Sequence, residues 1–191
     1  MCIRDSLHVV KVERRAINGG SLRMYVRRRA IPREDSWGLM CAWEHGVLGA
    51  DPVDALDRFG WQTQIIREQL QSAMRILQDH ETVCDLYAAS TKSSTLLQYC
   101  GIDHTQIRYA VERSPEKHGL ETTATRIWII SEESWHLNHT AVAMIGAWQF
   151  TDAFIRRESA YLASGGGFLV PLPRVRMIYQ GRPQPEVAHV R

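Results

Sequence analysis

The chain has 191 residues, of which 45% are hydrophobic and 23% charged, and its formal net charge is +2. Because the 23 basic and 21 acidic residues nearly cancel, a dedicated nucleic-acid-binding protein is not expected. No apolar run approaches the roughly 20 residues that span a bilayer, so the sequence predicts no membrane partner either.

Residues 1–30 are predicted to form a β-hairpin. Leu7–Glu13 alternates between apolar and polar residues, Asn18–Gly20 is typical of a turn, and Ser21–Val26 alternates again. A two-stranded hairpin is only marginally stable in water. We therefore expect the hairpin to pack on another part of the protein.

A linker and a long helix are expected next. Residues 31–50 contain a proline and several glycines, which favours a linker. Asp51 then suits an N-cap and Pro52 the first helical position. Apolar residues follow at intervals of three and four as far as His80, so the sequence predicts one amphipathic helix.

From Thr82 onward, predicted strands alternate with helices. Short apolar segments indicate five strands, at residues 82–89, 107–111, 127–130, 141–147 and 168–172. One of the helices is expected at Thr151–Ser164. This alternation predicts an α/β fold with a Rossmann-like, mostly parallel sheet and helices on both faces. The domain is assigned to residues 51–175, and the tail 176–191 is expected to be loose.

The segment Asp85–Gly101 resembles a strand, a polar loop and a helix that ends at a glycine. The loop and helix start contain Ser90, Thr91, Lys92, Ser93, Ser94 and Thr95. Ligands of open α/β sheets bind beyond the carboxyl ends of strands, and a helix N-terminus favours an anion. These residues are therefore candidates to bind a phosphate group. Hydroxylated residues also cap helices, and that alternative stays open.

Glu112 and Lys117 follow the second predicted strand of this domain, where α/β proteins often hold a ribose or a base. The alternative is a surface ion pair, which contributes little to stability. The sequence contains no Gly-x-Gly-x-x-Gly or P-loop motif and no recognisable catalytic triad. We therefore assign no catalytic or cofactor-binding residue.

The four cysteines are scattered and form no Cys-x-x-Cys pair. Cys84 and Cys100 fall in predicted core elements, which favours buried free thiols in a reducing cytoplasm. No secretory signal is recognised. The sequence predicts no metal site in this chain.

A set of segments in a fixed order extends over residues 10–175. These segments are Val12–Arg14, Gly19–Tyr25, Ala89–Lys92, Thr95–Ile102, Tyr109–Arg113 with Pro115 and Lys117, Ile129–Glu133, Trp148 with Phe150, and Gly165–Gly166 leading to Pro171–Pro173. Together they resemble the C-terminal part of the sugar C-methyltransferase family, whose members depend on S-adenosylmethionine and act on nucleotide-linked keto-deoxysugars.

The resemblance implies a protein of three parts, of which this chain resembles the last. A zinc-binding domain and a methyltransferase domain that binds S-adenosylmethionine would precede it, and the hairpin resembles the end of the methyltransferase sheet. The C-terminal domain is implied to hold the nucleotide-sugar. The catalytic cluster of the family precedes the hairpin and has no counterpart here, so the fragment alone is expected to be inactive.

Three positions depart from the pattern of the family. Lys92-Ser93 replaces Lys-Gly, and Ala124-Thr125 replaces Gly-Thr before the third strand. Trp148, Gln149 and Phe150 match a Trp-His-Phe motif, and the resemblance places them at the substrate site. Gln149 cannot transfer protons as histidine can.

The sequence therefore favours a C-terminal fragment of a C-methyltransferase in which this part binds the nucleotide-sugar. The alternative is a non-catalytic Rossmann-like domain that binds a nucleotide or mediates assembly. A small oxidoreductase is disfavoured because the dinucleotide-binding glycine motif is absent.

Overall fold

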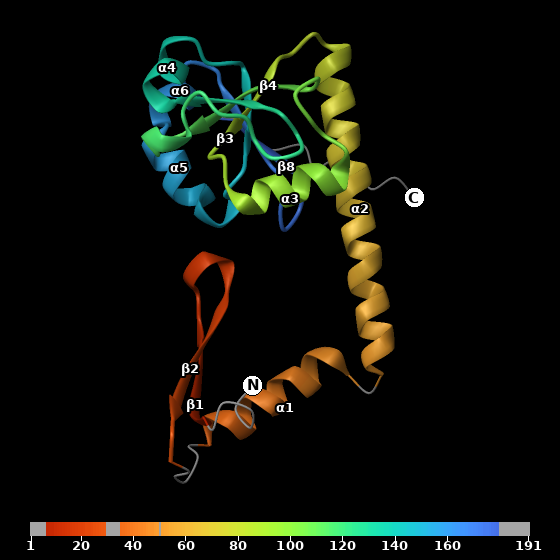
Figure 1. Cartoon of the computed structure of the whole chain (residues 1–191). Coiled ribbons are helices and arrows are strands. Elements are labelled where there is room, and N and C mark those ends of the chain that lie inside the picture. Colours follow the sequence, from red (N-terminus) through yellow and green to blue (C-terminus); the bar gives the residue numbers. More distant parts are fainter. Residues whose placement is uncertain (1–6, 30–34, 50, 180–191) are drawn as a thin grey trace. The chain divides into compact units, whose positions relative to one another are not determined.

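The computed structural model describes residues 7–29, 35–49 and 51–179 (Figure 1). The chain divides into two compact units, Met1–Gln62 and Thr63–Arg191. The division falls inside the long helix α2 (Pro52–Asp79). The expectations for residues 1–6, 30–34, 50 and 180–191 lie outside the described residues.

The first unit begins with a hairpin, in which β1 (His8–Arg15) pairs antiparallel with β2 (Ser21–Arg27). The turn between the strands has left-handed backbone angles at Asn18, Gly19 and Gly20, where φ is 55°, 83° and 125°. Asparagine and glycine adopt such angles more readily than other residues. The predicted antiparallel hairpin is confirmed.

Helix α1 (Ser36–Leu48) occupies most of the segment 31–50 that was expected to be a linker. It packs on β1, where Val9 and Val12 are buried. The Val12 N–H donates a hydrogen bond to the Ser36 hydroxyl at 3.2 Å. The linker expectation is therefore corrected for these residues. The helix forms despite its two glycines because packing on β1 outweighs weak helix propensity.

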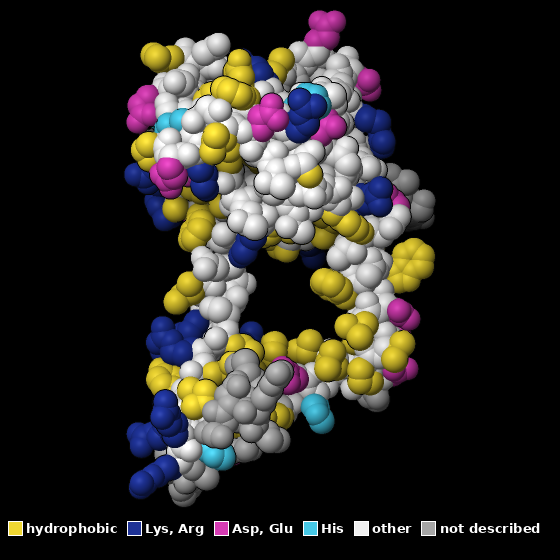
Figure 2. Space-filling model, in the orientation of Figure 1, with side chains coloured by type: hydrophobic (Ala, Val, Ile, Leu, Met, Phe, Trp, Pro, Cys, Tyr) yellow, Lys and Arg dark blue, Asp and Glu magenta, His cyan; other side chains and the backbone are white. Residues whose placement is uncertain are grey.

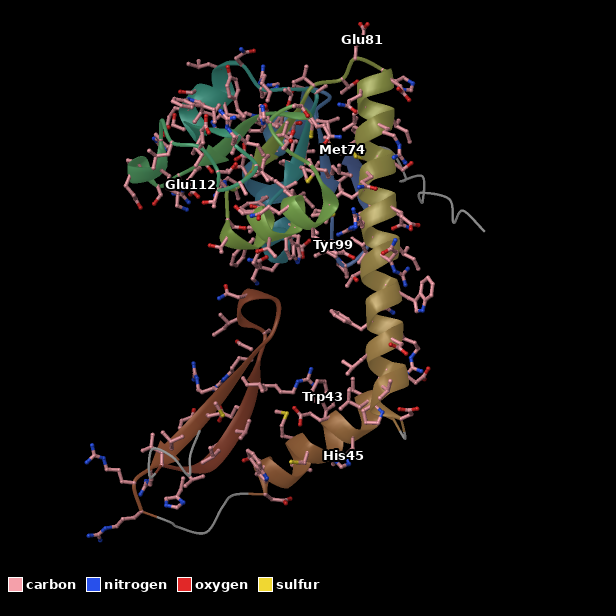
Figure 3. All side chains as sticks on the ribbon, turned by 45° about the vertical axis from the view of Figure 1, so that its right-hand side comes forward. Trp43, His45, Met74, Glu81, Tyr99 and Glu112 are labelled. Atoms are coloured by element: carbon pink, nitrogen blue, oxygen red, sulfur yellow. The ribbon has the colours of Figure 1, made fainter. Side chains whose placement is uncertain are left out.

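Helix α2 begins as the sequence predicts. The Asp51 carboxylate accepts hydrogen bonds from the N–H groups of Val53 and Asp54, which otherwise lack partners at a helix start. Leu70 and Met74 on the C-terminal half of α2 are fully buried in the core of the second unit (Met74 is labelled in Figure 3). The predicted apolar stripe is therefore a packing surface along this half of the helix.

The second unit contains a six-stranded sheet in the order β5-β4-β3-β6-β7-β8. The strands are β3 (Cys84–Tyr87), β4 (Ile107–Glu112), β5 (Trp128–Ser131), β6 (Val142–Ile145), β7 (Gly167–Val170) and β8 (Arg176–Tyr179). β3 to β7 pair in parallel, and β8 pairs antiparallel with β7. The predicted mostly parallel α/β fold is confirmed.

The expectation of a loose tail is wrong for Arg176–Tyr179. These residues form β8 along the outer edge of β7. Met177 and Ile178 point to opposite faces of the sheet, and each packs against the core on its own side. Packing of these two apolar side chains on opposite faces therefore orders the segment, although the tail around it is charged and contains prolines.

Helices cover both faces of the sheet (Figure 1). After α2 they are α3 (Thr91–Cys100), α4 (Glu132–Leu137), α5 (Thr151–Arg157) and α6 (Ser159–Ala163). Neighbouring residues of β3 point to opposite faces: Leu86 joins the core that includes Leu97 of α3, and Tyr87 joins the core that includes Trp135 of α4. The sheet is therefore packed against helices through one hydrophobic core on each of its faces.

The single helix predicted at residues 151–164 is two helices. α5 and α6 meet at Glu158, whose backbone has φ of −96° and ψ of 31°. Glu158 is only 4% exposed, and its carboxylate accepts hydrogen bonds from Tyr87 and His136. Because an unpaired buried carboxylate is very costly, these partners explain how Glu158 is tolerated in the buried junction of the two helices.

A buried aspartate ties the middle strands to α4. Asp85 of β3 is fully buried, and its carboxylate lies 3.1 Å and 2.9 Å from two guanidinium nitrogens of Arg108. The same carboxylate accepts from the Tyr109 N–H, the Trp135 indole N–H and the Thr140 hydroxyl. These donors compensate the desolvation of the charge, so the network fixes the register of β3 and β4.

Candidate functional site

Loops from three neighbouring strands meet at one edge of the sheet. β4, β3 and β6 are adjacent and parallel, so their carboxyl ends lie together. The chain leaves β3 toward β4 and leaves β6 toward β7, in opposite directions. The gap between β3 and β6 is therefore a topological switch point, the usual ligand site of an open α/β sheet.

The first loop ends in a capping box. The Ser93 N–H donates to the Ser90 hydroxyl at 3.1 Å, and the Ser93 hydroxyl lies 3.0 Å from the Ser90 N–H. Ser93 is buried, with 1% exposure. The capping alternative therefore applies to Ser90 and Ser93, and Gly101 ends the helix with φ of 66°, as predicted. Ser93 has no left-handed backbone angle, so glycine is not required there.

The other candidate residues of α3 lie further out. Thr91, Lys92 and Thr95 are exposed, and Ser94 is partly buried. The Ser94 hydroxyl donates to the Ser90 carbonyl at 3.4 Å and the Thr95 hydroxyl to the Thr91 carbonyl at 3.2 Å. The hydroxyls of Ser94 and Thr95 are thus directed to the backbone of α3. Thr91 and Lys92 are the exposed side chains in the first turn of the helix.

The loops after β3 and β6 are in very close contact. The Ser90 hydroxyl donates to the Gly146 carbonyl at 3.0 Å. A Cβ atom on Gly146 would lie 2.2 Å from the Ala88 carbonyl oxygen, so only glycine fits. Ala88 has φ of 71°, an uncommon left-handed angle for a residue with a side chain. Strained backbone is often found at ligand sites, and this one lies at the switch point.

The second loop brings Glu112 and Lys117 to the same edge (Glu112 is labelled in Figure 3). The Lys117 ammonium lies 2.8 Å from the Glu112 carboxylate and 3.4 Å from the Ala89 carbonyl oxygen of the first loop. Burial raises the pKa of Glu112, but hydrogen bonds from Lys117 and from the Arg113 and Ser114 N–H groups outweigh it, and the pKa is lowered. Glu112 is therefore a fixed carboxylate beside the first loop.

The third loop contains Trp148, Gln149 and Phe150 in a single 3₁₀ turn after β6. Trp148 and Gln149 are partly buried, whereas Phe150 is 44% exposed. Among the described residues, the Gln149 side-chain oxygen is the buried polar side-chain atom that has no hydrogen-bond partner. A buried acceptor without a donor is unfavourable by about 1–3 kcal/mol.

Sequence reasoning missed a polar cluster at the end of β3. The Tyr87 hydroxyl lies 2.5 Å from Glu158 and 3.1 Å from Glu132, and it accepts from Arg157 at 2.6 Å. Burial and the bond to Glu158 raise the pKa of Tyr87. His136 completes the cluster with a 2.8 Å contact to Glu158. The cluster anchors the residue that precedes the first loop; its members are too far apart in sequence to form a motif.

The residues of this edge do not fit S-adenosylmethionine. The first loop has Ala88, Ala89 and Ser90 where a cofactor loop has glycines. Among the described residues, no group of three His, Cys, Asp or Glu side chains is placed to hold a metal ion. A pocket of about 300 Å³ lies at the opposite end of the strands, beside Val83 and Ile107, and none of the candidate residues lines it.

No helix among the described residues is long and apolar enough to cross a membrane. Cys84 and Cys100 are free and buried, and burial raises the pKa of both thiols. They are therefore packing residues of the core.

Comparison with known proteins identifies the family. The family model described as "C-methyltransferase C-terminal domain" matches residues 16–173. The chain is also 30% identical over 175 residues to "C-methyltransferase NovU" of Streptomyces niveus. This match covers 90% of the chain and 41% of the relative, so the chain spans well under half the length of that protein. The chain belongs to the C-methyltransferase C-terminal domain family.

Proposed function

We propose that this chain is the substrate-holding part of an S-adenosylmethionine-dependent C-methyltransferase and that it binds a nucleotide-linked keto-deoxysugar. The observation that carries the proposal is the convergence of three loops at the switch point. Lys117 lies 3.4 Å from the Ala89 carbonyl oxygen, and Ser90 donates to the Gly146 carbonyl at 3.0 Å. A ligand at this edge can therefore contact all three loops.

Each loop offers a different chemistry to such a substrate. The N-terminus of α3, with Lys92, suits the diphosphate, because backbone N–H groups and the helix dipole favour anions. The Glu112 carboxylate suits ribose hydroxyl groups, which donate hydrogen bonds. Phe150 offers an exposed ring for packing against the base or the sugar. The Gln149 amide oxygen has no hydrogen-bond donor. A hydroxyl group of the substrate near this loop could supply one after a small rotation of the Gln149 side chain.

This chain contributes alignment to the reaction. Methylation of a carbon beside a ketone requires removal of a proton from that carbon and placement of the carbon against the methyl donor. We assign placement to the loops after β3, β4 and β6. The base, the site of S-adenosylmethionine and the zinc site implied by the resemblance are assigned to parts of a longer protein.

The test is Lys92→Ala in the full-length enzyme, with binding of the nucleotide-sugar measured by calorimetry. A charge-assisted contact is worth about 1.5–3 kcal/mol, so the affinity is expected to fall about ten- to a hundredfold. Arg156→Ala is the matched control, because Arg156 is an exposed cation on α5. Equal affinities for the two variants would refute the anion role of α3.

A further inference from the structure

The hairpin unit contains a second candidate ligand site. A concave surface between the hairpin turn and α1 borders a cavity with a volume of about 760 Å³. The residues that line it include Arg14, Arg15, Ser21, Leu22 and Trp43, and none of them is acidic. All of these residues belong to the first unit, so the surface is complete within that unit.

Arg14 is prepared to bind an anion. Its guanidinium carbon lies 3.9 Å from the centre of the Trp43 ring, which is a close cation–π contact (Trp43 is labelled in Figure 3). Stacking uses the face of the guanidinium group, whereas its five N–H donors point outward in the plane of the group. No hydrogen bond or ion pair holds the Arg14 side chain in the described part of the chain. Its donors therefore face solvent in a fixed orientation.

The neighbouring charges favour a phosphate. Between His8 and Arg29 the chain carries a single acidic residue, Glu13, and seven basic ones: Lys11, Arg14, Arg15, Arg23, Arg27, Arg28 and Arg29. The whole chain is only +2, so positive charge is concentrated in the hairpin. Dark blue side chains gather over the hairpin in Figure 2. Glu13 is paired with Arg15 at 2.5 Å and is itself outside the concave surface.

We propose that the surface between the hairpin turn and Trp43 binds the phosphate group of a phosphorylated small molecule. Arg14 supplies the bidentate contact that its planar fork makes with phosphate oxygens. The Ser21 hydroxyl, which is 3.3 Å from the Ile17 carbonyl oxygen, can turn to the ligand as a donor. Trp43 stacks on one face of the Arg14 guanidinium group and so restricts its orientation. This site is independent of the proposed sugar-nucleotide edge, because no residue is shared.

Binding of inorganic pyrophosphate to the full 191-residue chain tests the proposal. Two-dimensional NMR spectra should show saturable shifts of the Gly20 and Ser21 amides and of the Trp43 indole N–H. Arg14→Gln should raise the dissociation constant of this site at least about tenfold, since it removes a charge-assisted contact. Arg14→Lys, which keeps the charge without the planar fork, should give a smaller increase.

Two control variants test whether binding is specific to this concave surface. Arg28→Gln removes an equal charge from the hairpin outside the concave surface, and it should leave the dissociation constant within about twofold. Lys92→Ala alters the other proposed anion site, and it should not affect these NMR shifts. The proposal is overturned if pyrophosphate gives no saturable shift, if Arg14→Gln and Arg28→Gln weaken binding equally, or if Lys92→Ala abolishes the shifts.

Discussion

Replacement of Ser90 by alanine should destabilise the second unit through two lost hydrogen bonds. The variant removes the side-chain cap that accepts from the Ser93 N–H at 3.1 Å, and loss of such a cap costs about 0.5–2 kcal/mol. It also removes the donor to the Gly146 carbonyl at 3.0 Å, which contributes about 0.5–1.5 kcal/mol. Because the two bonds share one atom, we expect a combined loss of about 1–3 kcal/mol.

Urea unfolding measures this loss directly. The midpoint should fall while the slope stays unchanged, because the mutation does not alter the surface exposed on unfolding. By thermal unfolding, each 1 kcal/mol corresponds to about 2–4 °C for a chain of this size. Ser90→Thr keeps a hydroxyl at the cap and should recover most of the stability.

Thr91→Ala is the matched control. Thr91 is exposed at the first position of α3, so its replacement should change the free energy of unfolding by no more than about 0.5 kcal/mol. If Ser90→Ala and Thr91→Ala have the same effect, then Ser90 does not cap α3 and the assignment of the capping box fails.

Three further predictions concern residues elsewhere in the second unit. Ala124 has a left-handed backbone angle, with φ of 64°. Because this conformation costs alanine about 1–2 kcal/mol, Ala124→Gly should raise the melting temperature, and a lower melting temperature would contradict this. Asp85→Ala should lower the free energy of unfolding by about 3–5 kcal/mol because it leaves the buried Trp135 indole N–H and the Thr140 hydroxyl without this acceptor, and a loss below about 1 kcal/mol in urea unfolding would be inconsistent. Despite burial, hydrogen bonds from Tyr87 and His136 lower the pKa of Glu158 from 4.5; its contribution to stability is thus complete above pH 4.5 and is lost as the pH falls through the lowered pKa. Glu158→Gln should flatten the pH dependence of stability below pH 4.5, and an unchanged slope would argue against this role.

Local patterns in the sequence were sufficient for most elements. Apolar segments flanked by polar residues located β3 to β7, and Asp51, Pro52 and Gly101 located helix ends, because caps and breakers act within a few residues. The patterns were less informative where packing against other elements decides whether a segment is ordered. Segment 36–48 looks like a linker because of its glycines, yet it is helical against β1. The charged, proline-containing tail looks loose, yet its residues Arg176–Tyr179 pair with β7.

The candidate site shows the same division. The sequence alone determined that Ser90–Thr95, Glu112, Lys117 and Trp148–Phe150 follow strands of one α/β sheet, and the fold places these loops at one edge. Which of these side chains are exposed at this edge was decided by the tertiary structure. Ser90 and Ser93 close the start of α3, whereas Lys92 is exposed.

The polar contacts between distant segments could not be read from the chain. Tyr87 and Glu158 are 71 residues apart in the sequence, yet the Tyr87 hydroxyl lies 2.5 Å from the Glu158 carboxylate. Likewise, Arg14 of β1 stacks on Trp43 of α1. Periodicity reports which face of an element is apolar, and capping residues report where an element ends. Neither signal depends on which elements become neighbours, so the partners of a buried tyrosine or a stacked arginine are fixed only when the layers pack together.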